Sequence, residues 1–349
     1  MNDMKDNPLG VDGFEFVEFA APDGEILHTL FRHMGFTAIA RHKRQQITLY
    51  RQGDINFLVN EQPGSFAAGF AAQHGPCCVG FALRVEDADD AYASTLANGA
   101  ASMADVPKMA LDAPRIEGIG GSVLYLTDRN HGSVWEDEYE LLVGADPFPK
   151  GFGLTFIDHL THNVFHGNMD EWAEYYHRLF GFYEVRYFDI KGQQTGLTSR
   201  AMTSPTGVIS IPINQSSDPK SQINEYLDLY KGEGVQHIAL YTNDVYTTVE
   251  AMRERNIGFL DTPDTYYEII DRRVPKHDED LERMRTNRIL IDADEETGEK
   301  ILLQIFTKTN IGPIFFEIIQ RKGNKGFGEG NFTALFESIE LDQMRRGVL

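Results

Sequence analysis

The chain has 349 residues, enough for about two domains of ordinary size or one large one. Its 42% hydrophobic and 24% charged residues are typical of a globular protein and exclude a disordered, collagen-like or rod-shaped chain. Asp and Glu outnumber Lys and Arg by 53 to 32, which gives a formal net charge of -21. A surface of that charge repels phosphate backbones and anionic lipids, and the basic runs at 41–44 and 321–322 are short. We therefore expect neither a nucleic acid nor a membrane as partner.

The cysteines and the N-terminus indicate a cellular location. Cys77 and Cys78 are adjacent, so they cannot link distant segments, and they lack the spacing of a metal site. Residues 1–8 are polar and lack the apolar core of a signal peptide, and no run of about 18 apolar residues could span a bilayer. We therefore expect a cytoplasmic protein in a reducing environment.

Along the chain, the first strong signal is an internal repeat. A helix-like segment that ends at a glycine precedes a stretch of alternating residues in each half, and a strand-like segment precedes a second helix in each half. The matched segments are 30–36 with 177–182, 79–85 with 236–242, and 88–98 with 245–256. The order strand, helix, strands thus recurs twice per half, which predicts an α+β chain of duplicated modules.

Glycine and proline mark the boundaries of the halves. The stretch 146–153 is dense in both residues and predicts a linker, so we expect domains at 1–150 and 151–349. Near the end, the Gly-rich segment 322–330 leads into 331–346, where apolar residues recur at helical spacing. This pattern predicts a C-terminal amphipathic helix, and the glycines fit either a mobile lid or a loop without a gating role.

Three candidate metal ligands lie in the second half. Aligning the repeats places His159 and His237 where the first half has Phe19 and Gly80. Glu317 lies within an apolar strand-like run, and burying an unpaired carboxylate costs several kcal/mol, so it needs a cation or a metal unless the strand assignment is wrong. Two imidazoles and one carboxylate form the facial triad of non-haem Fe(II) oxygenases. Zn or Mn in a hydrolase or isomerase, and histidines that merely pack, are the alternatives.

His162 competes with His159 for the first ligand position. Alternate residues of a strand share a face, so His159 lies with Ile157 and Thr161 while His162 points to the opposite side. Only one of the two can therefore face a metal. We choose His159 because it aligns within the repeat, and we expect His162 to be a structural or rim histidine.

Several strings place the chain near a known family. They are RQGDIN at 51–56, IDHLTHN at 157–163, GVQHIA at 234–239, DTYY at 264–267, LLQIFT at 302–307, FEIIQR at 316–321 and GFGEGNF at 326–332. With these strings in order, the chain resembles the 4-hydroxyphenylpyruvate dioxygenase family in its bacterial form, within the vicinal-oxygen-chelate (glyoxalase/bleomycin-resistance) superfamily. The resemblance extends nearly end to end. It implies duplicated βαβββ modules that form two open β-barrel domains, the first without metal, and a C-terminal lid helix at 331–346.

The resemblance also implies an activity. One Fe(II) per chain would be held by His159, His237 and Glu317, and the enzyme would convert 4-hydroxyphenylpyruvate and O2 to homogentisate and CO2 in tyrosine breakdown. The substrate carries its own α-keto acid, so no separate 2-oxoglutarate is expected. The family further implies a homo-oligomer, either a dimer or a tetramer.

The same resemblance implies a set of site residues. The polar residues that would act on the substrate are Ser199, Asn214, Gln222, Gln236 and Gln304, and the residues that would bind it are Phe306, Phe315, Phe327, Asn331 and Phe332. Phe306 and Phe332 would sandwich the substrate ring. By strand alternation Gln236 should face away from His237 and orient that ligand rather than touch substrate. Phe315 is either part of the site wall or core filler.

Three rival functions were weighed. 4-Hydroxymandelate synthase shares the substrate and the triad, but that family tends to carry a smaller aliphatic residue at the position of Phe332, so Phe332 favours homogentisate. A non-catalytic chelate-fold binding protein needs no His159, His237 and Glu317 set. An extradiol ring-cleaving dioxygenase uses the triad but lacks the long-range strings.

Overall fold

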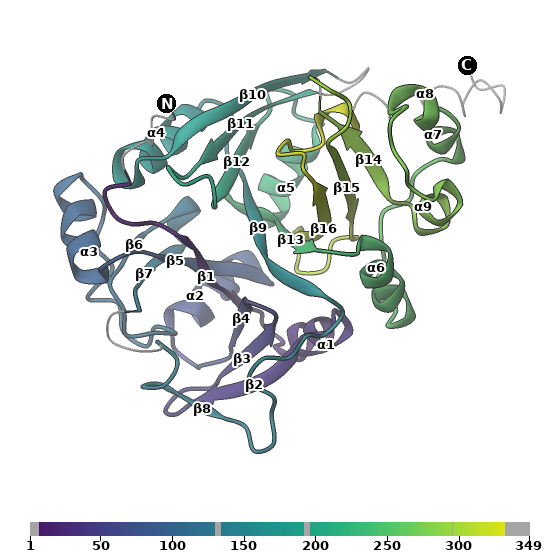
Figure 1. The fold of residues 1–349 in the computed structure, drawn as a ribbon. Helices are drawn as coiled ribbons and strands as arrows, with labels where there is room; N and C mark the ends of the chain where they lie inside the picture. Colours follow the sequence, from purple (N-terminus) through teal and green to yellow (C-terminus); the bar gives the residue numbers. More distant parts are fainter. Residues whose placement is uncertain (1–6, 130–133, 192–195, 295, 332–349) are drawn as a thin grey trace.

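Strand pairing gathers the alternating segments of each half into one curled sheet. The computed structural model describes residues 7–129, 134–191, 196–294 and 296–331. In Figure 1 the first sheet lies at lower left in purple to blue, and the second lies at upper right in teal to yellow. The first eight-stranded sheet has the spatial order β6 (Arg115–Glu117), β7 (Val123–Thr127), β5 (Cys77–Arg84), β1 (Gly13–Ala20), β4 (Ile55–Asn60), β3 (Ile47–Gln52), β2 (Thr37–His42) and β8 (Tyr139–Leu141).

The second eight-stranded sheet repeats this plan. Its spatial order is β10 (Tyr183–Lys191), β11 (Gly196–Thr203), β12 (Ser210–Gln215), β9 (Leu154–Asn163), β13 (Gly234–Thr242), β16 (Phe315–Lys322), β15 (Ile301–Phe306) and β14 (Leu290–Ala293). In both sheets the first strand runs parallel to one neighbour and antiparallel to the other, as β1 does between β4 and β5 and β9 does between β12 and β13. The predicted duplicated α+β fold is confirmed.

The two halves differ at their edges. In place of β14, the first half has an isolated bridge between Ser102 and Ile116. It adds β8 at the opposite edge, where β8 pairs with β2. The second module of the first half therefore departs from the plan of the other three modules.

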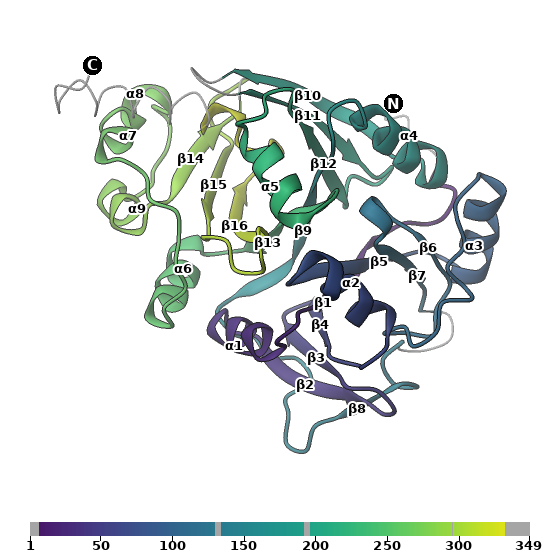
Figure 2. The same cartoon turned by 180° about the vertical axis from the view of Figure 1, so that it is seen from behind.

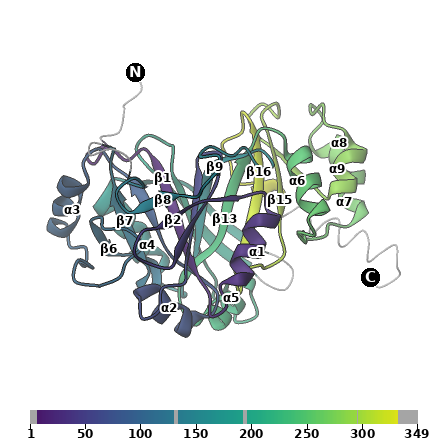
Figure 3. The same ribbon diagram turned by 90° about the horizontal axis from the view of Figure 1, so that it is seen from below.

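Helices cover the sheets from the outside. They are α1 (Glu25–His33), α2 (Phe66–His74), α3 (Ala88–Ala97), α4 (Met169–Phe180), α5 (Gln222–Tyr230), α6 (Val245–Glu254), α7 (Asp264–Glu268), α8 (Ile270–Arg273) and α9 (Leu281–Asn287), with a 3₁₀ helix at Ile119–Gly121. The glycines that the repeat predicts at the ends of α1 and α4 have positive φ, +87° at Gly35 and +70° at Gly181. Figure 3 shows α6 to α9 on the side of the second sheet away from the first half.

One hydrophobic core spans both halves. Phe316 of β16 packs against two aromatic rings of the first half, with ring centroids 6.5 Å from Phe19 and 5.9 Å from Phe57. At the rear, α2 and α5 lie next to each other (Figure 2), and the His74 ring nitrogen Nδ1 lies 2.6 Å from the Tyr230 carbonyl oxygen. The halves therefore form one packing unit although their sheets are separate.

The connection between the sheets is held by a buried amide. β8 ends at Leu141 and β9 begins at Leu154, so the boundary predicted after residue 150 lies in this connection. The Gln52 side chain is fully buried, and its Oε1 accepts hydrogen bonds from the backbone N–H groups of Phe152 (2.6 Å) and Leu154 (3.3 Å). The segment is therefore tied to the first sheet before β9 begins.

The Gly-rich segment near the end is shaped by close packing. A Cβ on Gly328, whose φ is +79°, would lie 2.3 Å from Nε2 of Gln304, and one on Gly330 would lie 2.1 Å from Oδ1 of Asp292. A side chain at either position would displace Gln304 or Asp292, and the positive φ of Gly328 further favours glycine there, so local packing is sufficient to explain both residues. A helix begins at Glu329; apart from its first residue, the predicted helix 331–346, and with it Phe332, lies outside the described residues. Within the described ranges, no helix is both long and apolar enough to cross a bilayer.

A carboxylate lies inside the first half. Glu18 is 1% exposed and accepts hydrogen bonds from Asn60 Nδ2 (2.7 Å) and from the Tyr125 hydroxyl (2.9 Å). Burial raises the pKa of Glu18 to about 7, although both hydrogen bonds act in the opposite direction. The folded protein therefore holds this proton at pH values where the unfolded chain has released it.

This proton predicts a pH dependence of stability. Between its ordinary pKa of 4.5 and about 7, Glu18 should lower the free energy of unfolding as pH rises, by roughly 1.4 kcal/mol per pH unit. The glutamine of Glu18→Gln cannot ionise. The free energy of unfolding of this variant, relative to that of the natural protein, should therefore rise with pH across this range and level off above it. Urea denaturation of both proteins from pH 4.5 to 8 measures the difference. A constant difference across the range would contradict the assignment.

Candidate metal centre

Strand register brings three predicted ligands to one face of the second sheet. Ala239 of β13 pairs with His159 of β9 on one side and with Glu317 of β16 on the other. His237 lies on the same face of β13 because alternate residues of a strand share a face. One ligand atom from each of the three side chains lies within 4.8 Å of the others. The predicted triad is therefore assembled from three strands that are neighbours in space and far apart in sequence.

The floor beneath the triad is apolar and separate from the main core. A small buried cluster of Ala239, Leu302 and Ile319, with Tyr241 packed against it, lies on this face of the sheet. His159 and Glu317 are only 2% and 3% exposed. Charges in this position are poorly solvated, so they interact strongly with one another and with any bound cation.

The electrostatics of the triad favour a carboxylate anion beside a cation. Although burial favours the neutral acid, the imidazoles of His159 and His237 hold the pKa of Glu317 at about 2. Burial alone would lower the pKa of His159, but Glu317 and Asp158 raise it to about 9. Burial lowers the pKa of His237. In the metal-free protein, a proton on His159 thus balances Glu317.

The donor set fits a divalent first-row metal. Nε2 of His159 lies 3.2 Å from Oε2 of Glu317, and Nε2 of His237 lies 3.5 Å from the same oxygen. The second oxygen of Glu317, Oε1, is buried and has no hydrogen-bond partner among the described residues. A buried carboxylate oxygen without a partner is costly unless a cation binds it. Two imidazoles and one carboxylate leave coordination positions open, as in non-haem iron sites.

Each ligand histidine follows a β-bulge. Asp158 is the extra residue between the pairs of Ile157 and His159, and Gln236 is the extra residue between the pairs of Val235 and His237. Each bulge turns its side chain toward the following imidazole. Oδ1 of Asp158 lies 2.8 Å from Nδ1 of His159, and Oε1 of Gln236 lies 3.1 Å from Nδ1 of His237.

These contacts orient both rings. A carboxylate only accepts, so Nδ1 of His159 carries the proton and Nε2 faces the triad. Although burial alone would raise it, the guanidinium of Arg321 holds the pKa of Asp158 well below its usual range. Gln236 thus contacts a ligand, as strand alternation predicted.

Aromatic rings line the space beside the triad. The Phe315 ring stacks on His237 at 4.9 Å and 21°, while Phe306 meets the same imidazole edge-on at 6.2 Å and 75°. Phe327 meets His159 edge-on at 5.6 Å. Three of the predicted aromatic residues therefore contact ligand imidazoles, and for Phe315 the structure favours the site wall over core filler.

A polar wall faces these rings. Ser199 of β11 pairs with Asn214 of β12, and both are buried. Nδ2 of Asn214 donates to Oδ1 of Asn163 at 3.3 Å, but Nδ2 of Asn163 and Oε1 of Gln304 are buried without partners in the described chain. Such orphaned groups are the expected partners of a bound ligand.

Asn163 was missed by sequence reasoning. The residue shares the face of His159 and Thr161 by simple alternation along β9, so the signal was present in the sequence. Alternation alone did not single out Asn163, because an asparagine at the end of a strand is also a common turn residue.

Some predicted residues do not join the site. Gln222 is exposed as the first residue of α5 and makes no contact with the triad within the described chain. Asn331 is 2% exposed, and its Oδ1 accepts hydrogen bonds from the Tyr266 hydroxyl (2.7 Å) and Arg273 Nη2 (3.1 Å), which anchor the segment. Direct substrate contacts of Gln222 and Asn331 stay predictions.

His162 faces away from the triad, as predicted. Its Nε2 lies 2.7 Å from the Tyr176 hydroxyl of α4. Burial lowers the pKa of His162 to about 3, so the ring stays neutral. His162 is therefore a structural histidine.

The first half corrects the sequence alignment at one position. Gly80 does correspond to His237, but Phe16, not Phe19, corresponds to His159, because Phe16 pairs with Ala82 as His159 pairs with Ala239. Ala82 also pairs with Tyr125, which corresponds to Glu317. The match between the strings 16–19 and 156–159 is out of register by three residues, and strand pairing reveals the correct register.

These positions exclude a second triad. The Phe16 and Tyr125 rings lie 5.1 Å apart where ligands would be needed. At Gly80 a Cβ would lie 2.0 Å from the carbonyl oxygen of Val123, so no histidine fits there. Within the described ranges, the triad of the second half is the only group of ligands found.

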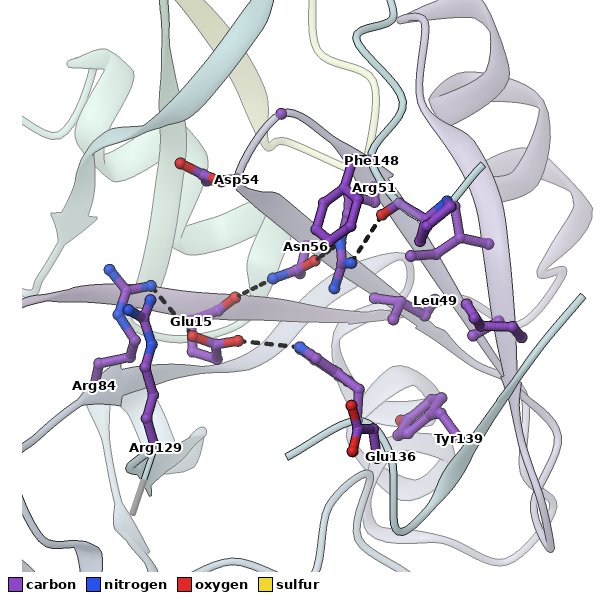
Figure 4. Close-up of a pocket in the computed structure, with 16 residues that line it drawn as sticks. Glu15, Leu49, Arg51, Asp54, Asn56, Arg84, Arg129, Glu136, Tyr139 and Phe148 are labelled. Atoms are coloured by element: carbon purple, nitrogen blue, oxygen red, sulfur yellow. Dashed lines mark hydrogen bonds and ion pairs between the residues drawn. The ribbon is translucent and has the colours of Figure 1, made fainter. Parts of the chain in front are cut away.

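The first half has a pocket of a different kind. It encloses about 620 Å³ at the end of the first sheet, near Glu15. Figure 4 shows that polar side chains of this pocket interact with one another. Nη1 of Arg84 donates to Oε2 of Glu15 (3.2 Å), and Nε of Arg51 donates to Oδ1 of Asn56 (2.7 Å). Among its described lining residues, none has a buried polar side-chain atom that lacks a partner. This pocket therefore offers a ligand no buried polar group that lacks a partner.

Comparisons with known proteins show the family to which the chain is similar. A family model described as "Hydroxyphenylpyruvate dioxygenase, HPPD, N-terminal" matches residues 5–140, and the "Glyoxalase/Bleomycin resistance protein/Dioxygenase superfamily" model matches 156–268. A protein of Vibrio vulnificus named "Hemolysin VllY" is 55% identical and covers 98% of both chains. A 4-hydroxyphenylpyruvate dioxygenase of Legionella pneumophila is 52% identical and covers 99% of both.

A solved structure shows the same fold. A variant of 4-hydroxymandelate synthase from Streptomyces coelicolor superposes with a TM-score of 0.81, over 96% of this chain and all of that one. The two sequences are 22% identical, so this likeness concerns the fold alone.

The triad predicts one metal ion per chain. Purified protein loaded with Fe(II) without oxygen should bind one equivalent, and Glu317→Gln should lose most of it because the only anionic ligand is gone. Glu18→Gln, which changes the buried carboxylate of the first half in the same way, should keep the full equivalent. Elemental analysis of the three proteins provides the measurement. Two metal ions per chain, or equal loss in both variants, would contradict the assignment.

Proposed function

This chain belongs to the 4-hydroxyphenylpyruvate dioxygenase family, and from that premise we propose that it is an Fe(II)-dependent enzyme converting 4-hydroxyphenylpyruvate and O2 to homogentisate and CO2. The observation that carries the proposal is the buried oxygen of Glu317 that lacks a partner beside two oriented imidazoles. It supports a bound cation at the triad. The identity of the metal as iron is part of the proposal.

The charge of the triad suits an anionic substrate. Glu317 contributes one negative charge, and a divalent cation that displaces the proton of His159 leaves the site with a net positive charge. A keto acid carboxylate is therefore attracted at short range, although the chain as a whole carries a net charge of -21. Bound Fe(II) would supply redox chemistry toward O2 and a template for the keto acid.

The side chains around the triad hold the rest of the substrate. Phe306, Phe315 and Phe327 offer ring faces and edges beside the ligands, so an aromatic ring placed there gains apolar burial and offset contacts. Asn163 and Gln304 contribute a free amide N–H and a free amide oxygen, which can bind the phenol hydroxyl or the keto acid. Ser199 and Asn214 extend the same wall.

The surrounding packing keeps the reacting groups dry. The triad lies on an apolar floor and is closed on the His159 side by Phe327. Exclusion of water strengthens each electrostatic contact and protects reactive species from side reactions.

Formation of homogentisate is proposed over formation of 4-hydroxymandelate. Support comes from relatives at about half identity over the whole chain that bear the dioxygenase name, whereas the hydroxymandelate synthase is similar in fold at 22% identity. We also propose a cytoplasmic homo-oligomer, a dimer or a tetramer, as the family resemblance implies. Light scattering during size-exclusion chromatography measures the molar mass of the assembly and tests this proposal.

The proposed activity has a direct test. Protein reconstituted with Fe(II) without oxygen should consume O2 when 4-hydroxyphenylpyruvate is added and release homogentisate and CO2 in equal amounts. His237→Ala should abolish turnover because it removes a ligand. His166→Ala, which changes an exposed histidine beyond the end of β9, should turn over like the natural protein. Oxygen uptake with chromatography of the product provides the measurement.

The alternative outcomes are distinct. Hydroxymandelate as the product would keep the metal site and overturn the choice of reaction. Metal binding without oxygen uptake would favour a binding protein of the same fold.

A further inference from the structure

Arg321 connects a ligand histidine to the C-terminal part of the chain. It lies on β16 on the same face as Glu317, and its guanidinium binds Asp158 with both arms: Nε donates to Oδ2 and Nη2 donates to Oδ1, each at 2.7 Å. The remaining arm, Nη1, donates to the carbonyl oxygens of Gly326 (2.6 Å) and Asn324 (3.3 Å). One side chain therefore joins the carboxylate that orients His159 to residues 324–327.

The contact continues on the other side of this segment. Phe327 meets His159 edge-on at 5.6 Å, and the Arg321 guanidinium lies 5.9 Å from the centre of the same phenyl ring. The carboxylate and guanidinium are 8% and 18% exposed, so solvent screens their attraction little. Residues 324–327 and the His159 imidazole are thus held by one shared set of contacts.

Neither of the comparable positions in this chain has such a link. His237 is oriented by the amide of Gln236, which makes no other side-chain hydrogen bond in the described part of the chain. At the corresponding bulge of the first half, Glu15 binds Arg84, but no ligand histidine follows it because Phe16 occupies that position. The connection between ligand and segment is therefore confined to the metal half and to one of its two histidines.

We propose that the Asp158–Arg321 pair is a positioning device that couples the orientation of His159 to the seating of residues 324–327. A metal ion bound to Nε2 of His159 would fix the orientation of the imidazole and, through its Nδ1, the position of Asp158. Arg321, which binds Asp158, would then be held in one position, and so would the carbonyl groups of Asn324 and Gly326 that accept its hydrogen bonds. When residues 324–327 are held in this position, they in turn favour the metal-binding orientation of the His159 imidazole, because coupling between two sites is reciprocal. The inference rests on the metal site proposed above and assigns no catalytic step to either residue.

The test uses metal binding by the full chain, without turnover. Co(II), whose absorption reports its coordination, is titrated against a competing chelator, and amide hydrogen exchange of residues 324–328 is measured with and without Co(II). In the natural protein Co(II) should slow exchange in this segment. Arg321→Met should bind Co(II) about 10- to 100-fold more weakly, the usual effect of losing a group that orients a ligand, and should lose the metal-dependent slowing.

Two further variants separate coupling from general instability. Arg321→Lys keeps the charge beside Asp158, but a single ammonium cannot reproduce the planar fork, so the metal-dependent slowing should also be lost in a folded protein. Glu15→Gln breaks the corresponding pair of the first half, and both measurements should match the natural protein.

The outcomes decide the proposal. It is wrong if Arg321→Met binds Co(II) as tightly as the natural protein, if exchange at 324–328 responds to metal as before, or if Glu15→Gln has the same effect. If the natural protein binds neither Co(II) nor Fe(II), the proposed function itself fails. If the natural protein and Arg321→Met bind metal equally well, only the coupling through Arg321 fails.

Discussion

A single buried carboxylate sets the conditions for the rest of the site. Glu317 lies on β16 with almost no exposure, and its charge is compatible with the fold only beside cations. Its neighbours across β13 and β9 are histidines, and in the metal-free chain one of them carries the balancing proton. The aromatic walls, the apolar floor and the oriented imidazoles all enclose this one charge.

The first half shows what the same plan becomes without that carboxylate. Tyr125 takes the place of Glu317, and its hydroxyl donates to Glu18, which keeps a proton of its own through burial. Aromatic rings fill the space where ligands would be, and the polar groups of the nearby pocket are paired with one another. The two halves therefore share strand order and bulges but differ in their buried polar groups. Those of the first half form hydrogen bonds with one another, whereas those of the second half form a site that can bind a ligand.

The two halves depend on each other through their shared core. Phe316 faces the first half while its neighbour Glu317 faces the metal site, so one strand serves both the interface and the chemistry. A change in packing between the sheets would shift β16 and with it a ligand. This arrangement explains how a half without metal supports the site from a distance.

Sequence alone predicted the α+β class and the repeat, because alternation along strands and the order of segments are local patterns. Local patterns offered His159, His237 and Glu317 only as candidate ligands, and the family resemblance is what favoured them as a triad. The sequence also placed His162 correctly, since alternation predicts which face a side chain takes. Gln236 contacts His237 as expected, but it does so from a bulge, where alternation is interrupted. Only the tertiary structure decided that Phe16 corresponds to His159, because strand pairing, and not the similarity of short strings, fixes which residues of the two halves correspond. It alone brought Asn163 into the site and left Gln222 exposed, and it alone joined Arg321 to Asp158. Those outcomes depend on which strands become neighbours, and that choice is made by long-range packing rather than by any local pattern of residues.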